Sequence, residues 1–218
     1  LKETATDRII EVLNKNSITF AIPLEYLKDK KETRVLDLGC SYGYFAYALR
    51  RLGYETWGTD VCTDALDFAN REFGDYYFNK HYLFEKYKTY DVIVALETIE
   101  HVIDPIKFID ENMERLNVGG ALILTTPNRN FYLKVMAKFL FEKMGLMDHF
   151  PISNRLKEIG DLFEEHVWFT DKPPIHMTLF DQKTFEVIAN LKGLKVSFID
   201  KYKEKGEMPP ILGVVLQK

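Results

Sequence analysis

Short apolar segments alternate with helical segments between residues 34 and 126, and this alternation limits the folds that the chain can adopt. The predicted strands are 34–38, 55–60, 75–78, 90–96 and 121–126. The predicted helices between them are 44–52, 63–73 and 104–116. Strands and helices at this spacing form βαβ units, in which helices cover both faces of a mostly parallel sheet. We therefore predict a doubly wound α/β fold.

The C-terminal part follows a different pattern. Residues 180–191 predict a helix, and only a short turn region joins the strands predicted at 195–199 and 211–217. Parallel strands need a connection of roughly a dozen residues or more, so we expect this last pair to be antiparallel. Together the elements predict a Rossmann-like sheet of seven strands, mostly parallel, with an antiparallel last strand.

Composition and length favour one globular domain over residues 1–218, with helices in 1–30 and a helical lid insertion at 130–175. Of the residues, 46% are apolar and 28% are charged, and no apolar run reaches the roughly 18–20 residues of a membrane span. We expect no signal peptide, because the first residues are polar and no apolar segment follows. Two cysteines cannot form a disulfide framework, so we expect a cytoplasmic protein. A net charge of −4 argues against general nucleic-acid binding.

A glycine-containing turn, 39–43, follows the first predicted strand, at the sheet edge where open α/β sheets bind ligands. Small residues let a ligand approach the backbone there, and the start of the next helix offers free N–H groups. Asp60 ends the second strand, where a carboxylate can accept hydrogen bonds from both hydroxyls of a ribose. A nicotinamide dinucleotide site would need G-x-G-x-x-G, but Ser41 and Tyr44 occupy the later glycine positions.

The segment 35–43 resembles motif I of the class I S-adenosylmethionine-dependent methyltransferases. The resemblance implies that S-adenosylmethionine is the cofactor and that the glycine turn holds its methionine part. It also implies that Asp37 organises the methionine end and that Asp60 holds the ribose. Two positions depart from the family pattern: Ser41 replaces the usual middle glycine, and His81 stands where many members carry an acid for the adenine amine. The expected cofactor-binding residues are Asp37, Gly39, Cys40, Ser41, Gly43, Asp60, Val61, His81 and Leu96.

Glu97, Glu100 and His101 follow the strand 90–96 at the spacing i, i+3, i+4, which would place them on one side of a helical turn. Two carboxylates and an imidazole can hold a divalent cation, which would orient substrate oxygens and lower the pKa of a hydroxyl. Without a metal, His101 is the natural general base for an acceptor hydroxyl. A purely structural interpretation stays open, because acidic residues at a helix N-terminus are favourable through the helix dipole alone.

The E-x-x-E-H run, 97–101, is similar to two branches of the same methyltransferase class. Ubiquinone-biosynthesis-type O-methyltransferases act on catechol-like precursors, and this similarity implies O-methylation of a small-molecule hydroxyl with S-adenosylhomocysteine as the product. In RNA 3′-terminal ribose 2′-O-methyltransferases the same residues bind Mg²⁺ together with a later histidine, and His176 stands in a similar place. We predict the first activity. The RNA activity, and a cofactor-binding module without catalysis, are the alternatives.

The turn that follows strand 121–126 is also similar to these methyltransferases and places Asn128 and Arg129 on the substrate side. Tyr132 and His176, near the two ends of the insertion, complete the expected substrate residues. Residues 130–147 predict an amphipathic helix with basic residues on its polar face. Such a helix can cover the active site as a cap or lie on a membrane surface. We expect the cap, with peripheral membrane contact as the alternative.

Overall fold

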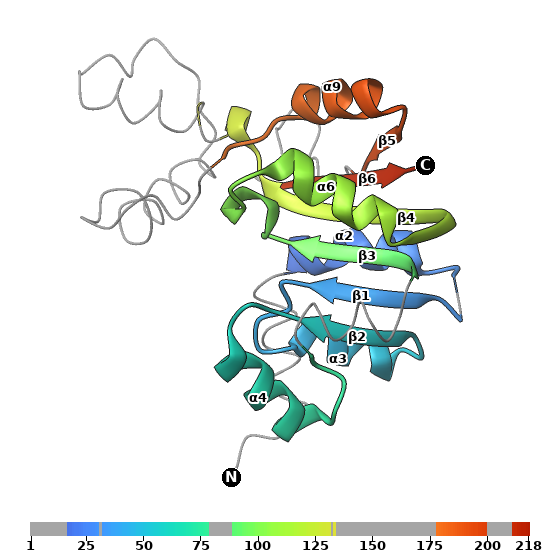
Figure 1. Ribbon diagram of the computed structural model, residues 1–218, viewed down its shortest axis with the longest axis vertical. Helices are drawn as coiled ribbons and strands as arrows, with labels where there is room; N and C mark the ends of the chain where they lie inside the picture. The colour runs from blue at the N-terminus through green and yellow to red at the C-terminus, as the bar shows by residue number, and fades with distance from the viewer. Residues whose placement is uncertain (1–16, 31, 79–88, 132, 134–177, 200–210) are drawn as a thin grey trace, which may run out of the picture.

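The computed structural model describes residues 17–30, 32–78, 89–131, 133, 178–199 and 211–218, and shows a sheet flanked by helices (Figure 1). In this part of the chain the strands are β1 (Arg34–Leu38), β2 (Glu55–Thr59), β3 (Tyr90–Leu96), β4 (Leu116–Pro127), β5 (Lys195–Phe198) and β6 (Ile211–Gln217). Their order across the sheet is β2-β1-β3-β4-β6-β5. The first four strands in that order pair in parallel, whereas β6 is antiparallel to both β4 and β5. The predicted Rossmann-like fold with an antiparallel last strand is confirmed.

Helices cover both faces of the sheet. Among the described residues they are α2 (Ser17–Leu27), α3 (Tyr44–Arg51), α4 (Thr63–Phe73), the 3-10 helix η1 (Ile99–His101), α6 (Pro105–Glu114) and α9 (Gln182–Lys192). Figure 1 shows α6 in front of the strands and α2 behind them. Val92 and Val94 of β3 pack with α2 and α3, while Ile93 and Ala95 pack with α6 and α9. A strand that is buried on both faces needs consecutive apolar residues, which explains the apolar run 92–96.

Two helices begin at aspartates that cap their free N–H groups. At the start of α6, Asp104 Oδ1 accepts a hydrogen bond from the Lys107 N–H at 2.9 Å, and Pro105 is the first helical residue. At the start of α9, Asp181 Oδ1 accepts a hydrogen bond from the Thr184 N–H at 2.8 Å. These side chains satisfy donors that a helix leaves unpaired in its first turn. The local sequence therefore sets where α6 and α9 begin.

The predicted strand 75–78 is wrong. Tyr77 makes a single bridge to Gly58, so the sheet of the described residues has six strands instead of the predicted seven. The physical reason is a local turn, in which the Tyr76 N–H donates to the Gly74 carbonyl at 2.8 Å, so the two groups that would extend the ladder with β2 are already paired. On the side that faces away from β2, the Asn70 side chain accepts from the Tyr77 N–H at 3.0 Å and donates to the Tyr77 carbonyl at 2.7 Å.

The predicted start of the strand 121–126 is also wrong, because β4 begins at Leu116 and contains Gly119 and Gly120. Its register against β3 shifts between Tyr90 and Val92, and Gly119, at φ 77°, takes part in this irregularity. The other predicted elements in the described residues start and end within two residues of their predicted bounds. None of the described helices is long and apolar enough to span a membrane. The predicted helix in 1–16 and nearly all of the insertion lie outside the described residues.

Candidate cofactor and active site

The glycine turn after β1 has three residues in the left-handed region of backbone space. They are Gly39 at φ 80°, Ser41 at φ 48° and Gly43 at φ 78°. The N–H groups of Gly39 and Cys40 both donate to the Thr59 carbonyl, at 2.8 and 3.0 Å, which fixes the turn against the end of β2. Ser41 adopts the conformation that a glycine usually supplies, at a cost of about 1 kcal/mol.

Both glycines of the turn, Gly39 and Gly43, have positive φ values and also lie too close to neighbouring residues to carry a side chain. A Cβ on Gly39 would lie 2.5 Å from Thr98 Oγ1, well inside van der Waals contact. A Cβ on Gly43 would overlap the ring of Tyr77, whose hydroxyl donates to the Gly43 carbonyl at 2.8 Å. The backbone of the turn therefore sits directly on its neighbours, with no room for side chains at these positions.

Asp60 lies just after β2 and holds the glycine turn from the other side. Its two carboxylate oxygens accept hydrogen bonds from the N–H of Ser41 at 2.8 Å and from the N–H of Cys62 at 2.9 Å. Each oxygen keeps a second lone pair, so the carboxylate can still accept from the hydroxyls of a ribose. Val61, which was expected to contact the cofactor, is fully exposed beside Asp60.

A cavity of about 250 Å³ opens beside this turn, at the carboxyl ends of β1 and β3. Its lining residues come from α2, β1, the glycine turn, α3 and the end of β3: Thr19, Phe20, Asp37, Gly39, Cys40, Ser41, Tyr42, Tyr44, Phe45, Leu96 and Glu97. Phe20 of α2 stacks on Phe45 of α3, with ring centroids 5.0 Å apart. The N-terminal helix thus forms one wall of the cavity.

Asp37 is the most informative residue of the cavity, because its side chain is only 2% exposed and one of its oxygens, Oδ2, has no hydrogen-bond partner. Burial raises the pKa of Asp37 to about 7, the nearby charge of Asp60 adds to this, and a backbone hydrogen bond from Ala46 opposes it. A buried oxygen without a partner is costly unless a ligand supplies a donor. The site therefore fits the ammonium group of an amino acid, the methionine end that the resemblance implies.

Glu97 lines the same cavity and is held by the next strand. Its backbone lies in the left-handed region at φ 47°, and its N–H donates to the carbonyl and hydroxyl oxygens of Thr125 at 3.0 and 3.1 Å. Oε1 is buried without a partner. Burial, reinforced by the charge of Glu100, raises the pKa of Glu97 to about 8, against a hydrogen bond from Thr125. Leu96, at the end of β3, lines the cavity beside it.

The expectation that Glu97, Glu100 and His101 share one side of a helical turn is wrong. Glu97 precedes η1 in a left-handed conformation, Glu100 is completely buried, and His101 is exposed. Burial raises the pKa of Glu100, and a charged His101 would oppose this shift. Within the described ranges no three His, Cys, Asp or Glu side chains come together as a metal site would require. The residues described here therefore do not fit the expected Mg²⁺, and His176, the fourth expected ligand, lies outside them.

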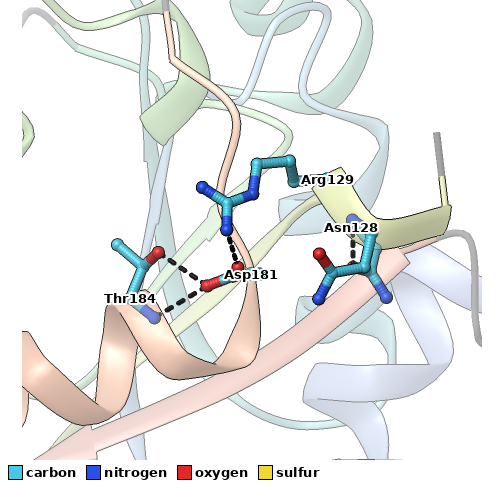
Figure 2. Close-up of polar contacts among 5 residues, drawn as sticks. Asn128, Arg129, Asp181 and Thr184 are labelled. Carbon is cyan, nitrogen blue, oxygen red and sulfur yellow. Dashed lines mark hydrogen bonds and ion pairs between the residues drawn. The ribbon is translucent and has the colours of Figure 1, made fainter. Parts of the chain in front are cut away.

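At the carboxyl end of β4, where substrate residues are expected from the sequence, Arg129 forms an ion pair with Asp181 (Figure 2). Asp181 also accepts hydrogen bonds from the N–H and hydroxyl of Thr184, at 2.8 and 2.7 Å. Burial alone would raise the pKa of Asp181, but the bonds from Thr184 and the charge of Arg129 outweigh it and lower that pKa. The Arg129 N–H donates to the Phe180 carbonyl at 2.7 Å. Arg129 thus joins β4 to the start of α9.

Asn128 is buried in the same junction, and its side-chain oxygen accepts from the Asn130 N–H at 3.1 Å. Asn128 and Arg129 therefore lie at the expected edge of the sheet with structural contacts of their own. Three further expected site residues, His81, Tyr132 and His176, lie outside the described residues.

Sequence reasoning missed Thr19 and Phe20 as cavity residues, as well as Tyr42, Tyr44 and Phe45. The three aromatic residues border the glycine turn and could have been found by their position in sequence. No local signal points to Thr19 and Phe20, because only the packing of α2 against the sheet brings them to the cavity.

The methyltransferase domain family matches residues 7–197 of this chain. A ubiquinone biosynthesis O-methyltransferase of Coxiella burnetii (strain Dugway 5J108-111) is 30% identical over 142 residues, which are 59% of this chain and 61% of that protein. The chain thus spans about three fifths of the length of this relative.

Two solved structures share the fold at low identity. Magnesium protoporphyrin IX methyltransferase (ChlM) from Synechocystis PCC 6803, with bound SAH, has a TM-score of 0.58 and 14% identity, covering 99% of this chain and 88% of that one. The methyltransferase domain of bacterial CtHen1 has a TM-score of 0.59 and 18% identity, covering 93% of this chain and 99% of that one. Since the family match extends over most of the sequence, the chain belongs to the methyltransferase domain family.

Proposed function

We propose that the protein binds S-adenosylmethionine and transfers its methyl group to a hydroxyl oxygen of a small molecule. The observation that carries this proposal is the cavity beside the glycine turn, which is lined by Asp37, whose buried Oδ2 has no hydrogen-bond partner. The family match supports methyl transfer, and the name of the 30% identical relative supports an oxygen acceptor.

The cavity residues, together with Asp60, which accepts from the Ser41 N–H beside them, fit the parts of this cofactor in order along the sheet edge. Asp37 would accept hydrogen bonds from the ammonium group, and the turn 39–43 offers close backbone contact to the methionine part. Asp60 would accept from the ribose hydroxyls with its free lone pairs. The adenine would then lie toward Val61, the exposed residue that follows Asp60.

Methyl transfer to oxygen requires a positioned nucleophile more than covalent help, because the sulfonium is already a good leaving group. An oxygen lone pair forms the new bond to the methyl carbon, the carbon–sulfur bond breaks, and its electron pair returns to sulfur. The hydroxyl proton needs a base. His101 is exposed at the end of η1, past the carboxyl end of β3, and would take up this proton.

The acceptor would approach along the carboxyl ends of β3 and β4, between His101 and the Arg129–Asp181 pair. Because the guanidinium of Arg129 is already paired, we propose that Arg129 shapes this edge, while recognition of the acceptor involves the insertion. A cytoplasmic location, and a cap or membrane contact through 130–147, are proposed with this function.

Isothermal titration with S-adenosylmethionine, followed by transfer of a labelled methyl group, tests the proposal. We expect micromolar cofactor binding and label transfer to a catechol, with no transfer to the 3′ end of a short RNA. Transfer to RNA alone would replace the small-molecule acceptor with the RNA activity. Cofactor binding without transfer to any acceptor would favour a binding module.

His101→Ala separates catalysis from binding. Loss of a general base typically lowers turnover by about 100- to 10,000-fold. We expect a loss in this range, with the dissociation constant of S-adenosylmethionine changed less than twofold, since His101 does not line the cavity. Unchanged turnover would remove His101 from the mechanism. Exposed Lys107 of α6 offers a matched control, because Lys107→Ala should alter neither quantity.

A further inference from the structure

Asp37 and Glu97 line the same cavity, and none of the described residues that line it is Lys, Arg or His. Asp37 Oδ2 and Glu97 Oε1 are both buried, and neither has a hydrogen-bond partner. Two unpartnered carboxylate oxygens at one cavity call for a ligand that brings positive charge or hydrogen-bond donors.

The position of Glu97 is fixed by β4. A left-handed backbone is strained for a glutamate and persists only where surrounding bonds enforce it. Here Thr125 accepts the Glu97 N–H with both its carbonyl and its hydroxyl oxygen, and Thr125 itself is completely buried. Glu97 therefore lines the cavity from a backbone that β4 holds in place, as a ligand-recognising group should.

We propose that Glu97 recognises the positive charge on the sulfonium of the cofactor, and so favours S-adenosylmethionine relative to the S-adenosylhomocysteine product. This inference rests on the proposed function and deepens it. The two ligands share the ammonium group, the ribose and the adenine, so Asp37 and Asp60 cannot tell them apart by charge. They differ at sulfur, which is positive before transfer and neutral after it.

The chemistry gives this recognition a role in turnover. When the methyl group leaves, the carbon–sulfur electron pair stays on sulfur and cancels its charge. The attraction between Glu97 and the sulfur centre is lost at that moment, while the other cofactor contacts persist. An acid beside sulfur therefore weakens product binding relative to substrate binding and helps the product to leave. In this arrangement Glu97 serves the cofactor instead of the metal that the sequence pattern suggested.

Glu97→Gln tests the proposal, because it removes the charge and keeps the shape of the side chain. Dissociation constants for S-adenosylmethionine and S-adenosylhomocysteine are measured by isothermal titration at pH 8.5, with EDTA present. We expect the affinity for S-adenosylmethionine to fall about tenfold, as for loss of one partly screened charge pair, and that for the product to change less than twofold. Thermal melting confirms that the variant is folded.

Two matched variants sharpen the result. Asp60→Asn weakens a contact to the shared ribose and should lower both affinities by the same factor. Thr125→Val removes the hydroxyl that accepts from the Glu97 N–H, and should reduce the difference between the two ligands by about two- to threefold. An analogue with an amine in place of the sulfonium tests the charge from the ligand side, and should follow S-adenosylmethionine in every variant.

Several outcomes would overturn the inference. These are an equal loss for both ligands in Glu97→Gln, no loss for either, or a loss that appears only when Mg²⁺ replaces EDTA. In each of these cases binding by the unaltered protein would leave the proposed function standing. Failure of the unaltered protein to bind either ligand would overturn the proposed function, and the inference with it.

Discussion

The two halves of the sheet edge differ in how their polar groups are used. Beside β1 and β3, Asp37 and Glu97 hold buried oxygens with no partner in the described residues, next to an open cavity. At the β4–α9 junction, Arg129 pairs with Asp181, and Asp181 also accepts two hydrogen bonds from Thr184 (Figure 2).

The polar groups beside β1 and β3 therefore suit ligand binding, whereas those at the β4–α9 junction stabilise the fold. Unpartnered buried groups lower stability, so groups of this kind beside a cavity suit a ligand that completes their hydrogen bonds. Groups that already satisfy one another stabilise the position of the chain, and their removal should affect stability more than binding. Each half therefore predicts a different response to substitution.

In the half of the sheet edge beside β1 and β3, Asp37→Asn should lower cofactor binding most strongly. The variant loses the charge that attracts the ligand ammonium, so we expect S-adenosylmethionine affinity to fall about 100-fold, equivalent to roughly 3 kcal/mol. Isothermal titration measures this loss. The melting temperature should rise at pH 8, because a buried charge is removed. An unchanged affinity would show that Asp37 does not contact the ligand.

Gly39→Ala should destabilise the fold through the glycine turn. The new Cβ meets Thr98 Oγ1 and the φ of 80° is unfavourable for alanine, so we expect a loss of about 2–4 kcal/mol in unfolding free energy. Gly53→Ala is the matched control, since Gly53 has φ 94° with open space around it and should lose only about 1 kcal/mol. Chemical denaturation compares the two. Equal losses would mean that close packing at Gly39 has no effect.

The pH should change both binding and stability through Asp37. With a pKa of about 7 in the empty cavity, cofactor affinity should fall about tenfold between pH 8 and pH 6, as the carboxyl takes up a proton. For folding the sign is opposite. Between about pH 4 and pH 7 the folded chain holds a proton that the unfolded chain has lost, so this group makes unfolding free energy fall as pH rises. Asp37→Asn should remove the Asp37 part of both dependences in titrations and melting curves, and leave the part that comes from Glu97, whose pKa is raised to about 8.

Asp181→Ala should act on the other half. It removes the cap of α9 and the partner of Arg129, and we expect a loss of about 1–2 kcal/mol in unfolding free energy. Cofactor affinity should stay within twofold, because neither residue lines the cavity. Thr184→Ala, which keeps the ion pair, should lose less. A large drop in cofactor affinity for Asp181→Ala would contradict the division between the two halves.

Ser41→Gly should have the smallest effect. Glycine relieves the left-handed strain at φ 48° but makes the unfolded chain more flexible, so we expect a gain of about 0.5 kcal/mol or less. The hydrogen bond from the residue 41 N–H to Asp60 is kept, and cofactor affinity should not change. Differential scanning calorimetry can detect the shift. A loss of stability would show that the serine side chain makes a contact worth more than the strain.

The fold was largely predictable, because its signals are local. Apolar runs mark β1 and β3, and Asp104-Pro105 marks the start of α6. The prediction failed at 75–78, where the Tyr76 N–H donates to the Gly74 carbonyl in a local turn instead of extending the ladder with β2. That Asp37, Gly39 and Ser41 lie together at the cavity was also predictable, since a short motif places them side by side.

The arrangement of the E-x-x-E-H run, 97–101, could not be predicted from the sequence. Helical spacing predicted a shared face, but the left-handed backbone at Glu97, enforced by Thr125 of β4, turns its side chain into the cavity while Glu100 is buried and His101 is exposed. No pattern within those five residues contains this information.

The order of strands and helices, the glycine turn and the acid after β2 followed from the amino-acid sequence alone, because they depend on periodicity and on residues near one another in the chain. The packing of α2 as a wall of the cavity, the separate directions of Glu97 and His101, and the pairing of Arg129 with Asp181 required the tertiary structure. Each of these depends on contacts between residues distant in sequence, and such contacts leave no local signal in the chain.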